Sequence, residues 1–137
     1  MIRAVLLSVL VLSACGGGDD PRVQCADAEA VLSAVNAARS EPRQCGATHY
    51  AAVPPLYLHG VLMQAAQSHA NDLASTGKTS HTGSDGSTVA DRAAAYRRPV
   101  GENVASGQVD LHQVMREFLA SPGHCQNIMN PYAVAFG

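Results

Sequence analysis

The sequence predicts one small α+β domain, and three observations lead to this fold class. The chain has 137 residues, 47% of them hydrophobic, which suits a single domain with a buried core. Apolar residues recur at helical spacing in several segments that turn residues separate. Residues 56–58 and 132–137 have the pattern of short strands instead. The formal net charge is −2 and no run of Lys or Arg occurs, so nothing indicates a nucleic-acid partner.

The N-terminal residues have the layout of a leader for export. Arg3 precedes an apolar run over residues 4–12, and the small residues Ser13 and Ala14 come directly before Cys15. The run is too short to anchor a protein across a bilayer but suits a signal peptide. LSAC resembles a bacterial lipobox, which implies cleavage before Cys15 and a lipid on that cysteine. An ordinary secretory signal with a chance cysteine is the alternative.

This leader sets the expected domain boundaries. Residues 1–14 form a lipoprotein signal peptide, residues 15–22 a Gly/Asp tether after the lipidated Cys15, and residues 23–137 the folded domain. Gly16 stands where many inner-membrane lipoproteins carry Asp. We therefore expect export and a membrane partner reached through the lipid, in the outer membrane if the host is Gram-negative.

Helix signals divide the domain into segments. Ser87 and Ser121 are placed to cap helices, and Gly77 and Asn130-Pro131 are stop signals. Residues 99–107 contain two glycines around a polar centre and predict a loop. The expected helices cover residues 26–39, a segment that Gly77 ends, residues 88–96, residues 109–120, and a short segment that begins at Ser121-Pro122.

If Cys15 is lipidated, Cys25, Cys45 and Cys125 remain for disulfides. The helix predicted over residues 26–39 would be about 20 Å long. The six residues after it could only just return that distance when fully extended. A Cys25–Cys45 bond would therefore be strained. Cys45–Cys125 is the preferred pair, which leaves the partner of Cys25 open.

His81, Glu102 and His124 are the candidate site residues, with Asn103 and Ser121 as neighbours. By spacing alone the histidines match no local zinc motif, and scattered histidines are more often surface or capping residues. The chain has neither an HExxH nor a GxSxG motif, so no catalytic residue is assigned.

Several segments in order resemble the CAP superfamily, or SCP-domain proteins, and its bacterial lipoprotein branch. This family includes cysteine-rich secretory proteins, venom allergens and plant pathogenesis-related proteins. The resemblance implies a three-layer α-β-α sandwich with an open cleft. The similar segments are NAARSEPRQCG, PPLYLHGVLMQAAQSHA, HANDLASTGKTSHTGSDG, GENVASGQ and FLASPGHCQNIMNP.

The resemblance also implies that His81, Glu102 and His124 line the cleft. Many eukaryotic members add a second Glu three residues after a Trp. Here Phe118 stands at the Trp position and Ser121 at the Glu position, so we expect a triad with a hydroxyl neighbour.

Two imidazoles and a carboxylate can bind Zn²⁺ and leave a position for water. His124 is expected in the first turn of its helix, where the helix dipole favours the neutral imidazole that binds metal. Asn103 is expected to bond backbone and hold the GEN segment. The alternative is a metal-free network in which Glu102 bridges both histidines.

The resemblance implies a binding or effector protein rather than an enzyme. We expect a membrane-tethered module whose cleft holds a divalent metal, with Zn²⁺ as the cofactor, and a lipid, sterol-like or cell-envelope ligand. The alternative is a metal-assisted hydrolase of peptide or cell-wall material. A Ser121–His124 nucleophile pair is formally available to it, although a cap explains Ser121 better. A purely structural envelope protein is the third reading.

The C-terminal part departs from the family pattern. CAP domains normally continue after the NIMNP segment with two strands, whereas only YAVAFG, residues 132–137, follows here. We therefore expect incomplete C-terminal strands and an open sheet edge.

Overall fold

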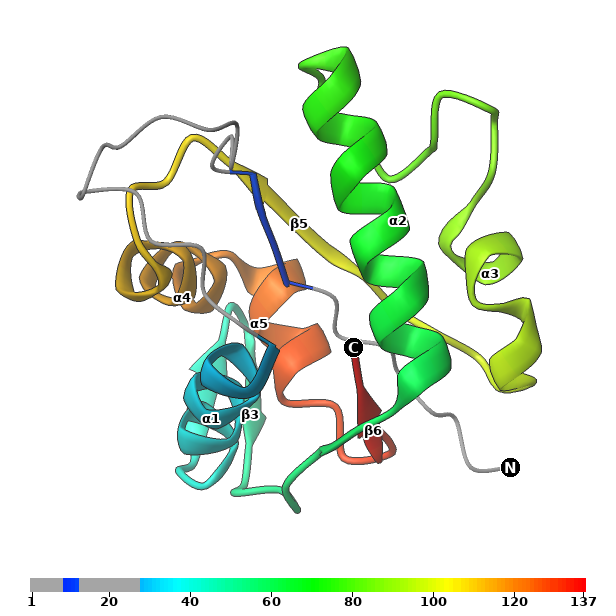
Figure 1. The fold of residues 1–137 in the computed structure, drawn as a ribbon. Helices are drawn as coiled ribbons and strands as arrows, with labels where there is room; N and C mark the ends of the chain where they lie inside the picture. Colours follow the sequence, from blue (N-terminus) through cyan, green and yellow to red (C-terminus); the bar gives the residue numbers. More distant parts are fainter. Residues whose placement is uncertain (1–8, 13–27) are drawn as a thin grey trace.

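The computed structural model describes residues 9–12 and 28–137, so Cys15 and Cys25 lie outside the described residues. The described part has the predicted α+β architecture (Figure 1). None of its helices is both long and apolar enough to cross a membrane. In chain order the elements are β1 (Val9–Leu12), α1 (Ala28–Arg39), β2 (Arg43–Cys45), β3 (Thr48–Tyr50), β4 (Tyr57–Leu58), α2 (Gly60–Thr76), α3 (Val89–Arg92), the 3-10 helix η1 (Ala94–Tyr96), β5 (Asn103–Ser106), α4 (Leu111–Ala120), α5 (Pro122–Ile128) and β6 (Ala135–Phe136).

The central strands lie between two groups of helices. Figure 1 shows β1, β5 and β6 between α2 on one side and α1, α4 and α5 on the other. Neighbouring residues of a strand point to opposite faces. In β5, Val104 packs against Leu73 of α2, whereas Ala105 belongs to the main core with α1, α4 and α5. In β6, Ala135 joins a cluster with α2 and Phe136 joins the main core. This alternation produces the three layers.

The strands of the described residues pair two by two. β2 and β3 form an antiparallel hairpin, β4 runs parallel to β6, and β1 runs parallel to β5. In the last pair Val9 lies opposite Asn103 and Leu12 lies opposite Ser106. A stretch of the predicted leader thus lies along one edge of β5.

The structure corrects two of the predicted segments. Residues 99–107 are not all loop, because Asn103–Ser106 form β5, whose first three residues are buried. The helix expected over residues 88–96 is divided into α3 and η1. Its cap is Thr88 and not Ser87. The Thr88 hydroxyl accepts from the backbone N–H of Asp91, and the Asp91 carboxylate accepts from the N–H of Thr88, which makes a capping box.

Other helix ends agree with the sequence more closely. α2 ends at Thr76, and Gly77 follows with φ 65°, the left-handed conformation that glycine adopts without strain. Ser121 is the N-cap residue of α5 and Pro122 is its first residue, as predicted. The Ser121 hydroxyl caps no backbone N–H, however, and α5 ends at Ile128, before the predicted stop signal.

The predicted Cys45–Cys125 disulfide is present and joins β2 to α5 across 80 residues of sequence. Gly46 beside it has φ 60°, and a Cβ there would lie 2.9 Å from Cβ of Pro122, so the hairpin needs glycine to approach α5 this closely. In the loop-entropy account, a crosslink across 80 residues stabilises the fold by about 4.5 kcal/mol.

Arg39, the last residue of α1, is completely buried. Its Nε and Nη2 donate to the carbonyl oxygen of Pro54 at 2.9 and 2.6 Å. Its Nη1 donates to the carbonyl oxygens of Ile128 at 2.5 Å and Asn130 at 3.1 Å. Burial lowers the pKa of Arg39 to about 10, which leaves it protonated at neutral pH. This guanidinium therefore ties α1 to the segment before β4 and to the end of α5.

Replacing Arg39 with Met is expected to lower the free energy of unfolding by about 3 kcal/mol or more, because buried carbonyl groups lose charged donors. Chemical denaturation of the full chain measures this change. Arg116→Met on the exposed side of α4 is the matched control, with an expected change within about 0.5 kcal/mol. Equal losses in the two variants would contradict the role assigned to Arg39.

Candidate functional site

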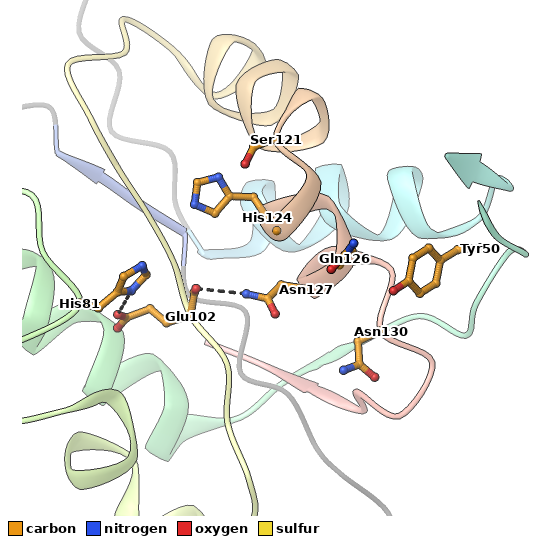
Figure 2. Close-up of a pocket in the computed structure, with 9 residues that line it drawn as sticks. Tyr50, His81, Glu102, Ser121, His124, Gln126, Asn127 and Asn130 are labelled. Carbon is orange, nitrogen blue, oxygen red and sulfur yellow. Dashed lines mark hydrogen bonds and ion pairs between the residues drawn. The ribbon is translucent and has the colours of Figure 1, made fainter. Parts of the chain in front are cut away.

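The structure brings His81, Glu102, Ser121 and His124 to the wall of one open cavity of about 590 Å³ (Figure 2). His81 belongs to the loop between α2 and α3, and Glu102 directly precedes β5. Ser121 and His124 come from the start of α5. Asn103 lies behind this wall and not among the lining residues.

Both carboxylate oxygens of Glu102 are bonded. Oε1 accepts from Nδ1 of His81 at 2.8 Å, and Oε2 accepts from Nη2 of Arg92 at 2.8 Å. The side chains of Glu102 and Arg92 are only 2% and 9% exposed, whereas that of His81 is 63% exposed. The buried ion pair therefore balances the carboxylate charge, and His81 extends from it toward solvent.

The bond to Glu102 decides which ring nitrogen of His81 can act. A carboxylate can only accept a hydrogen bond, so Nδ1 carries the proton and the Nε2 of the neutral ring keeps its lone pair. An imidazole supported by a carboxylate in this way can bind a metal ion or take up a proton.

The loop that carries His81 is attached to both flanking helices. Asp72 of α2 accepts from the hydroxyl and the backbone N–H of Ser84, and these bonds hold the pKa of Asp72 below its ordinary value. Arg92 of α3 donates to the backbone oxygen of Ser87 at 2.8 Å and of His81 at 3.2 Å. Arg92 thus connects the loop to Glu102, a role that the sequence did not predict.

His69 lies under this network and is 1% exposed. Its Nε2 donates to the backbone oxygen of Ser80 at 2.9 Å and lies 4.0 Å from Oε1 of Glu102. Its Nδ1 has no hydrogen-bond partner among the described residues. His69 is therefore a core histidine with one nitrogen bonded.

Two asparagines fix α5 to the start of β5. Nδ2 of Asn127 donates to the backbone oxygen of Glu102 at 3.2 Å and to Oδ1 of Asn103 at 2.9 Å. Nδ2 of Asn103 donates to the backbone oxygen of His124 at 3.2 Å, so Asn103 bonds backbone as predicted. Figure 2 shows Asn127 reaching toward Glu102. These bonds set the position of His124 relative to Glu102.

Burial lowers the pKa of His124, and His81 lowers it further. The ring packs against Phe118, with centroids 4.8 Å apart. A neutral His124 at pH 7 agrees with the sequence prediction, but the causes are burial and a neighbouring histidine rather than the helix dipole.

A His81→Ala substitution is expected to raise the pKa of His124 only part of the way to its ordinary value. The substitution removes the positive charge that His81 can carry, but the larger cause, burial, remains. NMR titration of the His124 ring protons measures the change, with His112→Ala on α4 as a control that should leave it unaltered.

The same shift predicts how stability depends on pH. The unfolded chain binds a proton at His124 more readily than the folded domain does, so this contribution to stability is complete above the unfolded pKa of about 6.5. It is lost as the pH falls from there through the lower pKa of the folded state.

A His124 pKa that does not move in His81→Ala would contradict the assigned coupling.

The cavity wall also contains residues that were not candidates. Gln126 and Asn127 follow His124 on α5, and a run of amide residues at helical spacing was the available signal. Asn130 and Tyr50 also line the cavity. Tyr50 lies on the β2–β3 hairpin, which the sequence did not predict.

A test of the metal hypothesis starts from the donor atoms. Within residues 9–12 and 28–137, no three His, Cys, Asp or Glu side chains lie close enough together to hold a metal ion. Glu102 accepts one hydrogen bond at each carboxylate oxygen, so the donors without a partner among the described residues are Nε2 of His81 and the ring of His124. The residues present would offer a metal ion two imidazole nitrogens, with Glu102 as the carboxylate partner behind His81.

A family model, CAP, described as the cysteine-rich secretory protein family, matches residues 32–137. A search of curated proteins and a search of solved structures gave no match. The matched range contains every residue that lines the cavity.

Proposed function

The chain belongs to the cysteine-rich secretory protein (CAP) family, and on this premise we propose that it is an exported binding module whose cleft takes a ligand between His81 and His124. The observation that supports the proposal is the open cavity where an oriented His81 and a neutral His124 both lie. Each ring has at least one nitrogen that makes no hydrogen bond to the described residues, so both rings are available to a ligand.

A divalent metal ion, with Zn²⁺ as the first candidate, is one ligand of this cleft. When bound it would supply a positive charge that polarises a neighbouring water or ligand oxygen. His81 and His124 would hold it through ring nitrogens. Glu102 would keep the proton of His81 on Nδ1, and Arg92 would keep Glu102 charge-balanced in its buried position.

The cleft supports binding better than hydrolysis. Figure 2 shows no hydrogen bond between Ser121 and His124, so the serine has no base that would activate it. Glu102 is bonded through both oxygens and is not free to serve as a general base. Metal-assisted hydrolysis of peptide or cell-wall material would have to rely on His81 or His124.

Calorimetric titration of Zn²⁺ into the full chain, with the Cys45–Cys125 bond formed, tests this proposal. We expect about one equivalent to bind and His81→Ala and His124→Ala each to weaken binding at least tenfold, because each removes one of two protein ligands. His49→Ala on the β2–β3 hairpin and His112→Ala on α4 are the matched controls. Binding that either control abolishes, or that neither cleft variant alters, would contradict the metal site.

We also propose export and a lipid anchor at Cys15, in the outer membrane if the host is Gram-negative. The leader pattern supports export, as does the Cys45–Cys125 disulfide, since such bonds form and persist in oxidising compartments. Membership of the CAP family supports it too, because members are generally secreted. Cleavage before Cys15 would separate Val9–Leu12 from the domain and free the edge of β5.

Labelled palmitate tests the anchor in a bacterial expression host. We expect incorporation into the chain and its complete loss in Cys15→Ser, because the modified residue is then absent. Cys45→Ser should keep the label. A chain that is exported without label would point to the ordinary secretory signal.

A further inference from the structure

The half of the cleft opposite His81 is lined by uncharged polar side chains. Figure 2 shows Tyr50 from β3 on the side of α5 where Gln126 lies, with Asn130 below them and Ser121 above. We call the residues Tyr50, Ser121, Gln126 and Asn130 the amide wall. None of them is an expected metal ligand, and together they present hydroxyl and carboxamide groups to the cavity.

Most of these groups keep hydrogen-bonding capacity for a ligand. The Tyr50 and Ser121 hydroxyls have no partner among the described residues. Oδ1 of Asn130 accepts from the N–H of Tyr132, which leaves its NH₂ group free. Nε2 of Gln126 makes only a 3.5 Å contact with the backbone oxygen of Cys45, and its Oε1 is free. The wall therefore offers both donors and acceptors to a ligand.

The lining disfavours charged and apolar ligands. Arg92 already balances Glu102, so an organic cation finds no unpaired carboxylate, and no Lys or Arg lines the cavity to pair with an anion. Tyr50 is the one Phe, Tyr, Leu, Ile, Val or Met side chain among the lining residues, which is too little apolar surface to cover a lipid chain. A cavity of about 590 Å³ with many neutral donors and acceptors suits a neutral molecule rich in hydroxyl groups.

The amide wall is also held rigid before any ligand arrives. The Cys45–Cys125 bond joins the hairpin that carries Tyr50 to the helix that carries Gln126. Gly46 permits close contact between the hairpin and Pro122 at the start of α5. A preformed wall loses little conformational entropy on binding, which favours weakly interacting, uncharged ligands.

We propose that the amide wall binds a neutral saccharide chain, with sugar hydroxyls bonded by Tyr50, Gln126 and Asn130. This inference rests on the proposed function, because it assigns the ligand class of the same cleft. The saccharide would lie beside the two histidines, and its binding would not depend on them.

The test uses the full chain and two neutral probes, the tetramer of N-acetylglucosamine and maltotetraose, with palmitate as the apolar comparison. NMR or calorimetric titration should show binding of at least one saccharide. Tyr50→Phe and Asn130→Asp should each weaken it about fivefold to tenfold, since each removes a hydrogen-bond donor while the Asp keeps the acceptor for Tyr132. Tyr57→Phe on β4 and Asn71→Asp on α2 are matched exposed controls and should leave binding unchanged.

Three results would overturn the inference: a folded chain that binds neither saccharide, saccharide binding that the wall variants do not alter, or displacement of the saccharide by palmitate. His81→Ala separates this inference from the metal proposal. Saccharide binding that survives while Zn²⁺ binding is lost supports the amide wall as an independent site. Zn²⁺ binding without saccharide binding keeps the metal proposal and removes the inference.

Discussion

The buried guanidinium of Arg39 is the interaction on which the rest of the structure depends. It donates hydrogen bonds to backbone carbonyl oxygens of two segments, at Pro54 and at the end of α5. These carbonyl groups are not bonded within a helix or a strand pair of the described residues. One turn earlier, the Asn36 side chain bonds both backbone groups of Leu56. α1 therefore organises the chain around it through polar side chains, because buried backbone groups must be bonded. Since α5 carries His124, the position of the cleft follows from this helix.

The cleft lies between two parts of the domain that are stabilised by different interactions. On the His81 side, a buried ion pair and its backbone contacts connect α3, the loop and Glu102, and Asp72 connects the loop to α2. On the Tyr50 side, a disulfide connects a hairpin to α5. Asn127 and Asn103 form the polar connection across the boundary. Charge is concentrated in one half and neutral polarity in the other, so one cavity offers two kinds of chemistry.

The sequence predicted features that depend on local rules or on a few long-range constraints. Helical periodicity located α1, α2 and α4, Gly77 ended α2, and chain length favoured the Cys45–Cys125 pair. The resemblance, now supported by the family match, named His81, Glu102 and His124, which all line the cavity.

The missed features depend on partners that are distant in sequence. β5 was predicted as loop because its strand character comes from burial between two layers, not from its own glycine-flanked residues. The residues around Arg92 gave no signal of its role, because that role depends on its ion pair with Glu102 in the folded domain. The sequence could have predicted Thr88 as the cap of α3, because a Thr followed three residues later by Asp has the spacing of a capping box.

The disulfide has a consequence for the order in which the molecule assembles. Cys125 follows Cys45 by 80 residues, so during synthesis or export Cys45 emerges long before its partner. Until then it can meet only cysteines that precede Cys125, and a bond to one of them must be exchanged before α5 can dock. Thiol–disulfide exchange takes seconds to hours, depending on the oxidant and isomerase. The cleft is thus completed late, because α5 can dock only after Cys125 has emerged.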